Sequence, residues 1–94
     1  SNEPGYYRNG AFGIRVENLI FVANVEGGID THRNLLGFET LTYVPFERKL
    51  IDVSLLSKEE VAWIDAYHAK VLDKVGPHLD LPTRGWLSAA CAPL

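Results

Sequence analysis

The apolar residues of this chain change their periodicity once, near residue 57. Before that point, segments 12–25 and 36–45 are rich in β-branched and aromatic residues, which favour strands. After it, apolar residues recur every three to four positions, as in an amphipathic helix. Strands followed by helices are typical of an α+β fold, so we expect an α+β structure with antiparallel strands first and helices after them.

Turn-forming residues separate the expected strands. Segment 3–7 is short and extended, and Asn9-Gly10 marks the turn that follows it, because these residues accept a positive φ. Segment 26–34 contains Gly27-Gly28 and is expected to be a loop between the two longer strands. Segment 46–52 is a connection that can add a short extended piece.

The helical half carries clear start and stop signals. Ser57 and Glu60 form the sequence pattern of a capping box, which predicts a helix from Lys58 to about Val75. Gly76-Pro77 should end it. A second, shorter helix is expected near Pro82, because proline suits the first turn, and it should carry Trp86 and Leu87 inward.

Composition excludes several classes of partner. The 94 residues have a net charge of -3 and no basic stripe, so we expect neither a nucleic-acid nor a membrane partner. No apolar stretch approaches the roughly 20 residues that span a bilayer. Cys91 is the single cysteine and cannot form an internal disulfide, which fits a reducing, cytoplasmic compartment.

Arg15 and Glu17 lie two positions apart in the predicted strand 12–25, so they share one face of it. A charge on a buried strand face is costly unless it is paired or bound to a metal. Two interpretations therefore stay open. One is a surface ion pair on a half-solvated sheet, and the other is a functional pair.

Two longer motifs surround this pair. Asn-Glu-Pro-Gly-Tyr-Tyr at 2–7 and Gly-Ala-Phe-Gly-Ile-Arg-Val-Glu-Asn at 10–18 closely resemble the last two metal-binding segments of the X-prolyl aminopeptidases, which are pita-bread metallopeptidases. The resemblance continues through segments 36–45, 50–52 and 63–68 to Trp86-Leu87, which look like the C-terminal extension of the longer, cytosolic-type enzymes. It covers essentially the whole chain.

The resemblance implies a domain organisation. Residues 1–52 would be the C-terminal strands of a pita-bread catalytic domain, and residues 53–94 a C-terminal helical extension. The chain starts without Met and runs at once into the first motif, so we expect it to be a piece of a longer protein.

The resemblance also implies a site and an activity. Glu3 and Glu17 match metal ligands, with Glu17 bridging two divalent ions: manganese, or zinc or cobalt in its place. Arg15 would orient a carboxylate, and Tyr7 matches a tyrosine near the family's site. The implied substrates are peptides with proline at the second position, cleaved by a cytoplasmic enzyme that forms a homodimer at full length.

The loop between the two motifs decides whether the two glutamates can share a site. A two-residue hairpin at Asn9-Gly10 would place Glu3 opposite Val16 and send Glu3 and Glu17 to opposite faces. A three-residue loop, 9–11, places Glu3 across from Glu17. We predict that longer loop or a bulge.

The family's remaining ligands, two aspartates and a histidine, have no counterpart in this chain. His32 is expected in a solvated loop, His68 as a packing residue and His78 on the surface, and Cys91 has no base pattern that would make it a nucleophile. We therefore expect the 94-residue piece alone to be inactive. The aspartates without the family context are Asp30, Asp52, Asp65, Asp73 and Asp80.

Other classes of function stay open. The chain could come from a catalytically silent pita-bread homologue that acts as a binding module, or it could be a free-standing α+β interaction domain. The large side chains of the helical half could pack on the sheet or face a second subunit; they are Trp63, Tyr67, Trp86 and Leu87.

Overall fold

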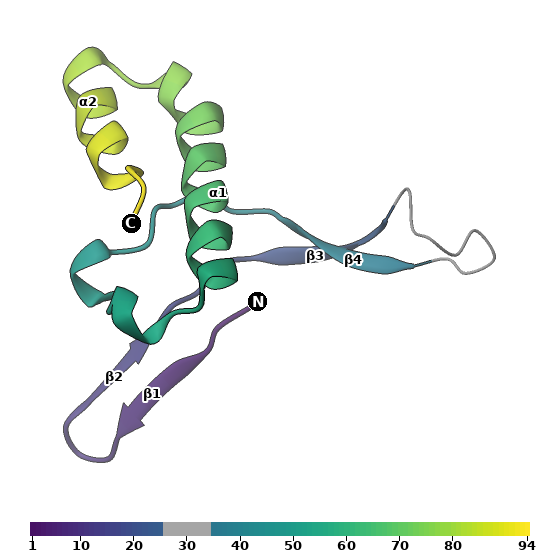
Figure 1. Cartoon of the computed structure of the whole chain (residues 1–94), viewed down its shortest axis with the longest axis vertical. Helices are drawn as coiled ribbons and strands as arrows, with labels where there is room; N and C mark the ends of the chain where they lie inside the picture. The colour runs from purple at the N-terminus through teal and green to yellow at the C-terminus, as the bar shows by residue number, and fades with distance from the viewer. Residues whose placement is uncertain (26–34) are drawn as a thin grey trace. The chain divides into compact units, whose positions relative to one another are not determined.

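The computed structural model describes residues 1–25 and 35–94. Residues 1–42 form one compact unit of two β-hairpins, and residues 43–94 form a second unit of helices (Figure 1). Strands precede helices along the chain, and the strand pairs are antiparallel, which confirms the α+β prediction. The predicted loop 26–34, with Asp30 and His32, lies outside the described residues.

The first hairpin pairs β1 (Gly5–Arg8) with β2 (Phe12–Arg15). Arg8 lies opposite Phe12, so three residues, 9–11, make the loop. Gly10 supplies the positive φ of 71° that this loop needs, and the Ala11 amide donates to the Arg8 carbonyl at 3.0 Å. The predicted three-residue loop is confirmed.

The second hairpin pairs β3 (Ile20–Asn24) with β4 (Leu36–Thr40). The prediction of one continuous strand over 12–25 is wrong, because the segment has two different partners. Residues up to Asn18 bond back to the start of the chain, whereas β3 pairs with β4. At the change of partner, the Leu19 amide donates to Thr42 Oγ1 at 2.9 Å. The strand predicted over 36–45 ends at Thr40.

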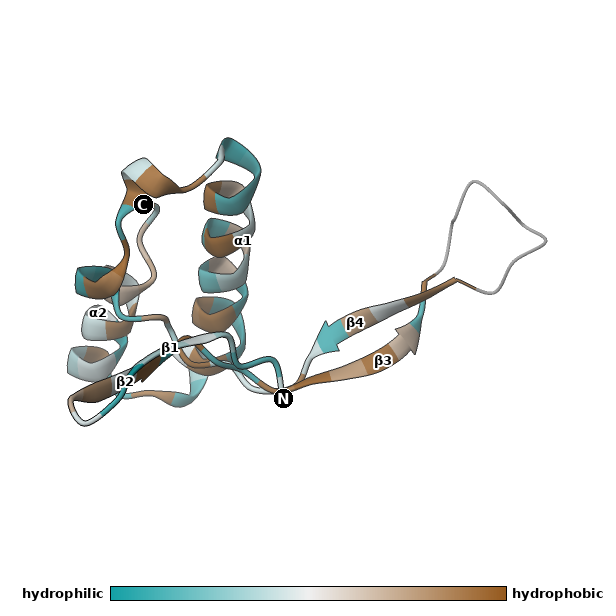
Figure 2. Ribbon diagram, turned by 90° about the horizontal axis from the view of Figure 1, so that it is seen from below, coloured by the Kyte–Doolittle hydropathy of each residue, from teal (hydrophilic) through white to brown (hydrophobic). Residues whose placement is uncertain are grey.

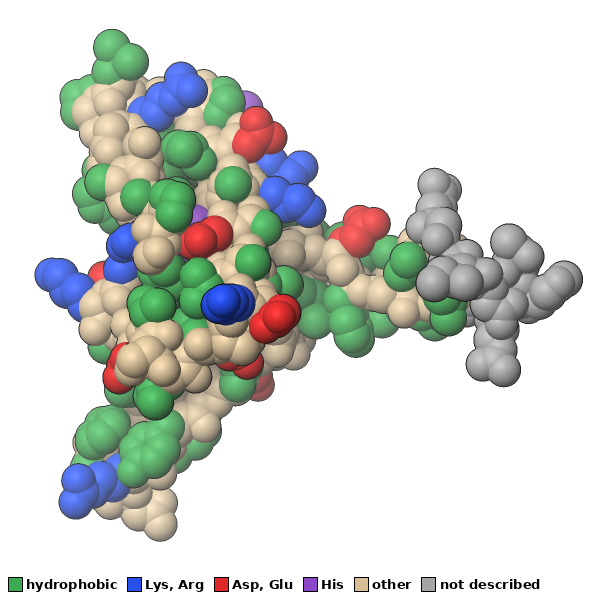
Figure 3. Space-filling view, in the orientation of Figure 1, with side chains coloured by type: hydrophobic (Ala, Val, Ile, Leu, Met, Phe, Trp, Pro, Cys, Tyr) green, Lys and Arg blue, Asp and Glu red, His purple; other side chains and the backbone are tan. Residues whose placement is uncertain are grey.

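Both hairpins bury little of their side-chain surface. Phe38 is 72% exposed, and hydrophobic side chains lie open along β3 and β4 in Figure 3. A two-stranded hairpin with both faces in water is only marginally stable, so these strands depend on further protein surface for stability.

Two 3₁₀ turns open the helical unit, at Arg48–Leu50 and Val53–Leu55, in place of the extended piece expected over 46–52. The cause is local: the Glu47 and Asp52 side chains accept hydrogen bonds from backbone amides two residues ahead, both at 3.1 Å. Such side-chain acceptors compete with extended structure.

Helix α1 (Lys58–Val75) begins and ends where the sequence predicts. The capping box is complete, since the Ser57 amide donates to Glu60 Oε2 at 2.9 Å and the Glu60 amide donates to Ser57 Oγ at 3.1 Å. A 3₁₀ turn at Gly76–His78 follows. Helix α2 (Leu81–Ala90) then starts behind the Asp80 cap, with Pro82 in its first turn. No helix of the described residues is long and apolar enough to cross a bilayer.

The core of this unit is small. Tyr67, Val71, Leu87 and Cys91 are buried, and Figure 2 shows the apolar positions of α1 recurring along the helix. Partly buried apolar residues surround them: Tyr43, Phe46, Leu72, Val75 and Leu79. Tyr67 also fixes the preceding segment, because its hydroxyl donates to the Val44 carbonyl at 2.7 Å and accepts from the Val44 amide at 3.2 Å.

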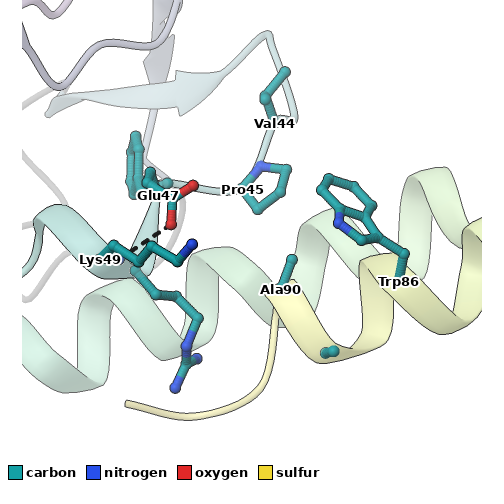
Figure 4. Close-up of a pocket in the computed structure, with 9 residues that line it drawn as sticks. Val44, Pro45, Glu47, Lys49, Trp86 and Ala90 are labelled. Carbon is teal, nitrogen blue, oxygen red and sulfur yellow. Dashed lines mark hydrogen bonds between the residues drawn. The ribbon is translucent and has the colours of Figure 1, made fainter.

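The prediction that Trp86 and Leu87 both point inward is wrong for Trp86. Leu87 is 3% exposed and Trp86 65% exposed. Neighbouring positions on an α-helix differ by about 100° around its axis, so the two side chains cannot share one face. Trp86 instead lines a groove of about 370 Å³, with Pro45 and Ala90 among the other lining residues (Figure 4).

Candidate functional site

The first hairpin extends beyond its regular strands and brings the two motif glutamates face to face. Asn2 and Asn18 form a bridge, with N–H···O distances of 2.9 and 3.1 Å, and the Val16 amide donates to the Pro4 carbonyl at 3.1 Å. Glu3 and Glu17 occupy the positions between these bonded pairs. In an antiparallel ladder, such a non-hydrogen-bonded pair has its Cα atoms about 4.5 Å apart, the closest approach that the ladder gives. The predicted register of Glu3 against Glu17 is confirmed.

The same face carries a cation. Arg15 Nε lies 3.6 Å from Glu17 Oε2, and the two side chains are 50% and 47% exposed. As an exposed pair it contributes about 0–1 kcal/mol to stability. The contact is the surface ion pair that one interpretation of the sequence expected, and it lies on the same face of the hairpin as Glu3.

The side chain of Tyr7 lies on the same face of the hairpin and packs over two glycines. A Cβ built at Gly13 would lie 2.8 Å from Tyr7 Cδ1, and one built at Gly5 would lie 2.9 Å from the Tyr7 hydroxyl oxygen and 3.0 Å from Arg15 Cγ. The Tyr7 ring therefore lies over Gly13, and its hydroxyl lies over Gly5 beside the Arg15 side chain. Tyr6 belongs to the opposite face, where its ring centroid is 6.0 Å from that of Phe12.

The structure thus brings the four residues predicted from sequence to one face of one hairpin: Glu3, Tyr7, Arg15 and Glu17. Two opposed carboxylates destabilise a bare sheet, which makes a bound cation a favourable neighbour for them. Carboxylate oxygens suit hard divalent ions such as manganese. Across residues 1–25 and 35–94, no cluster of three or more His, Cys, Asp or Glu side chains could hold a metal. The pair therefore fits part of a ligand set.

His68 is a structural residue, as predicted. It is 0% exposed, and its Nε2 accepts a hydrogen bond from the Phe46 amide at 3.0 Å, while Nδ1 has no partner among the described residues. Burial lowers the pKa of His68, and the nearby Arg48 lowers it further, whereas Asp65 opposes the shift. The neutral imidazole is therefore favoured.

The other candidate groups also match their predicted roles. His78 is exposed. Cys91 is buried, and burial raises the pKa of its thiol, so the nucleophilic thiolate is disfavoured.

Sequence reasoning missed two features of this hairpin. One is the role of Gly5 and Gly13 beneath Tyr7; the alternation of Gly5 with Tyr7, and of Gly13 with Arg15, was the available signal. The other is Asn18, which is 6% exposed and whose Nδ2 has no partner among the described residues. No pattern in the sequence marks it as buried.

Comparison with known proteins identifies the family of the chain. Residues 34–94 match the family model described as the C-terminal region of peptidase M24, so the chain belongs to this family. It is also 46% identical over 97 residues to a probable Xaa-Pro aminopeptidase P of Laccaria bicolor and 49% identical over 100 residues to aminopeptidase P2 of Arabidopsis thaliana. Both alignments cover 100% of the chain but only 15% and 14% of those relatives.

A solved structure gives the same result in three dimensions. The X-prolyl aminopeptidase of Caenorhabditis elegans, described as a cytosolic enzyme with a di-nuclear active site, matches with a TM-score of 0.87 and 38% identity. The match covers 98% of this chain and 15% of that enzyme. The two hairpins and two helices therefore correspond to the C-terminal region of its pita-bread fold, and the chain spans about one seventh of the length of its relatives.

Proposed function

We propose that the whole protein is a dinuclear metallopeptidase that hydrolyses the bond between an N-terminal residue and a following proline. The observation that carries the proposal is the placement of Glu3 opposite Glu17, with Arg15 and Tyr7 on the same face. The relatives named Xaa-Pro aminopeptidase P and aminopeptidase P2 support it, since both alignments cover the whole chain and therefore both motifs.

Glu17 would bridge two divalent ions, and Glu3 would bind one of them. Manganese suits these oxygen donors, and zinc or cobalt could replace it. When bound, the metal pair would supply Lewis-acid activation of water and of the scissile carbonyl group. The neighbour with a di-nuclear active site supports the number of ions.

Two side chains of the hairpin would complete the chemistry. Arg15, whose Nε lies 3.6 Å from Glu17 Oε2, would hold the Glu17 carboxylate in one orientation through a charge-assisted contact. The Tyr7 hydroxyl, which lies over Gly5, offers a hydrogen-bond donor on the face that would meet the substrate.

Replacement of Glu17 by Gln tests the proposal in the whole protein. We expect cleavage of an Xaa-Pro peptide in the presence of manganese to fall by more than about 100-fold, because loss of a ligand costs at least as much as loss of the groups that orient it. Bound manganese should fall in the same variant. Glu59→Gln, on the exposed first turn of α1, should leave both unchanged. A wild-type protein that cleaves no Xaa-Pro peptide would refute the proposal and favour the silent homologue.

The 94 residues alone should be inactive. Their two carboxylates form an incomplete ligand set, because no third ligand stands near them among the described residues. Equilibrium dialysis with manganese should show weak binding at most. Tight one-to-one or two-to-one binding by the isolated chain would contradict this proposal.

The larger organisation belongs to the same proposal. Residues 1–52 would complete the catalytic domain, and residues 53–94 would form its helical extension. A cytoplasmic location is supported by the description of the neighbour as a cytosolic enzyme. A homodimer at full length is supported by the exposed Trp86, since aromatic residues are enriched at interface centres.

A further inference from the structure

Gly5 and Gly13 are glycines whose φ angles do not require glycine. Among the described glycines, Gly10 alone has a positive φ, so the conformation at positions 5 and 13 is open to other residues. A Cβ at Gly13 would instead lie 2.8 Å from Tyr7 Cδ1, and a Cβ at Gly5 would lie 2.9 Å from the Tyr7 hydroxyl oxygen and 3.0 Å from the Ile14 carbonyl oxygen. Their missing side chains therefore make room for the tyrosine.

The direction of the Tyr7 ring follows from these two contacts. Its Cδ1 atom lies over Gly13, directly across the ladder, and its hydroxyl lies over Gly5, two positions back along β1. Glu3 is two positions further back on the same face, and Glu17 lies opposite it. The ring therefore leans along the hairpin toward the carboxylate pair. Positions two residues apart on a strand are separated by about 7 Å, which is the spacing between Gly5 and Glu3.

We propose that Gly5 and Gly13 are positioning residues: they seat the Tyr7 ring flat on the hairpin and direct its hydroxyl toward the Glu3–Glu17 pair. A side chain at position 13 would lift the ring off the sheet, and the hydroxyl would leave its place beside Arg15. Tyr7 is 64% exposed, so most of its ring surface is not packed against the described residues. The inference rests on the proposed peptidase function for its activity measurement and on geometry for the rest.

Packing of an aromatic ring over a cross-strand glycine also stabilises hairpins by itself, so the test must separate this role from positioning. Tyr7→Phe keeps the ring over Gly13 and removes only the hydroxyl. If the ring were mere cover, this variant would behave as the wild type.

The activity test compares kcat of the whole protein on an Xaa-Pro peptide. We expect Tyr7→Phe and Gly13→Ala each to lower kcat by about tenfold to 100-fold, as expected for one lost hydrogen bond to a charged group. The double variant should be no worse than Tyr7→Phe, because both changes remove the same placed hydroxyl. Tyr6→Phe, on the opposite face, and Gly85→Ala, which has nothing within 4 Å of its missing Cβ, should keep wild-type kcat.

A second measurement needs no activity. In protein labelled with 3-fluorotyrosine, the ¹⁹F resonance of Tyr7 is the one lost in Tyr7→Phe. Gly13→Ala should shift that resonance and leave the resonance of Tyr6 in place.

The outcomes separate this inference from the proposed function. A wild-type protein without peptidase activity refutes the proposed function. The ¹⁹F shift still tests whether Gly13 positions the Tyr7 ring, because it needs no activity. An unmoved Tyr7 resonance in Gly13→Ala, wild-type kcat in Tyr7→Phe, or additive losses in the double variant would each overturn the inference. Should Gly13→Ala fail to fold, equal kcat values for Tyr7→Phe and Tyr6→Phe would overturn it.

Discussion

At the scale of single residues, the strand register decides which side chains share one face of the first hairpin. The loop of three residues sets an odd offset between β1 and β2, and this offset alone places Glu3, Tyr7, Arg15 and Glu17 on one face. Deletion of one loop residue would send the two glutamates to opposite faces. The proposed chemistry of the hairpin therefore depends on the length of a loop that contains none of the candidate site residues.

Arg15 is expected to act through Glu17. Arg15→Gln removes the guanidinium 3.6 Å from the carboxylate, and manganese affinity of the whole protein should fall by about 10- to 100-fold, the usual effect of removing a group that orients a ligand. Arg15→Lys should give a smaller loss, because it retains a point charge without the planar fork. Isothermal titration with manganese measures both.

Arg8→Gln is the matched control for that experiment. Arg8 lies in the same hairpin at a position whose side chain faces away from the glutamates, since side chains alternate along a strand. The affinity of the Arg8→Gln variant for manganese should equal that of the wild-type protein. An equal loss in Arg8→Gln and Arg15→Gln would show that the effect is one of overall charge.

At the scale of elements, the bounds of α1 could be predicted from local sequence signals, whereas the pairing of strands could not. Both helices begin at side-chain caps that the sequence displays, and α1 has its predicted bounds. The segment 12–25 has the residues of one strand but forms parts of two hairpins, because its halves pair with residues before and after it. Propensity describes a segment, but it does not identify the partner.

The capping box predicts a local loss of stability. Ser57→Ala removes the acceptor for the Glu60 amide and should cost about 1 kcal/mol at the start of α1. Hydrogen exchange of the amides in the first turn of α1 should speed up by roughly fivefold, the factor that such a free energy represents. Ser88→Ala, at an exposed position of α2, should leave exchange in α1 unchanged. Unchanged exchange in Ser57→Ala would contradict the capping role.

At the scale of the whole molecule, the helical unit joins distant segments through a few polar contacts. The Phe46 amide reaches His68 across 22 positions, and the Leu94 amide donates to Asp65 Oδ1 at 2.9 Å. The Arg48 guanidinium donates to the carbonyls of Ala92 and Pro93, which fixes its charge near the imidazole. The small core makes such contacts important for stability.

His68 should make this unit sensitive to acid. Its pKa is lowered by burial, then by Arg48, against a smaller opposing effect of Asp65. The unfolded chain therefore binds more protons below its ordinary pKa of about 6.5, and stability should fall as the pH drops from there toward the lower folded pKa. Protonation would also take the acceptor away from the Phe46 amide. Hydrogen exchange of segment 44–49 in the whole protein, corrected for intrinsic rates, should lose protection over this range.

Two variants test the origin of that acid sensitivity. His68→Gln keeps an acceptor for the Phe46 amide but does not titrate, so segment 44–49 should stay protected from about pH 7 to 5, the range around the ordinary histidine pKa. His78→Gln changes an exposed histidine and should behave as the wild type. The same loss of protection in His68→Gln and the wild type would exclude His68 as its cause.

The order of strands and helices, the bounds of α1 and the three-residue loop could be predicted from the sequence, because each depends on local propensity or on strand alternation. The four candidate site residues were proposed from the resemblance of two motifs to a known family, and strand alternation predicted that they share one face. The partners of segment 12–25, the exposure of Trp86, the burial of Asn18 and the seat of Tyr7 on two glycines became visible in the folded chain alone. These features depend on which surfaces meet after folding, and contact between distant residues leaves no periodic signal along the sequence.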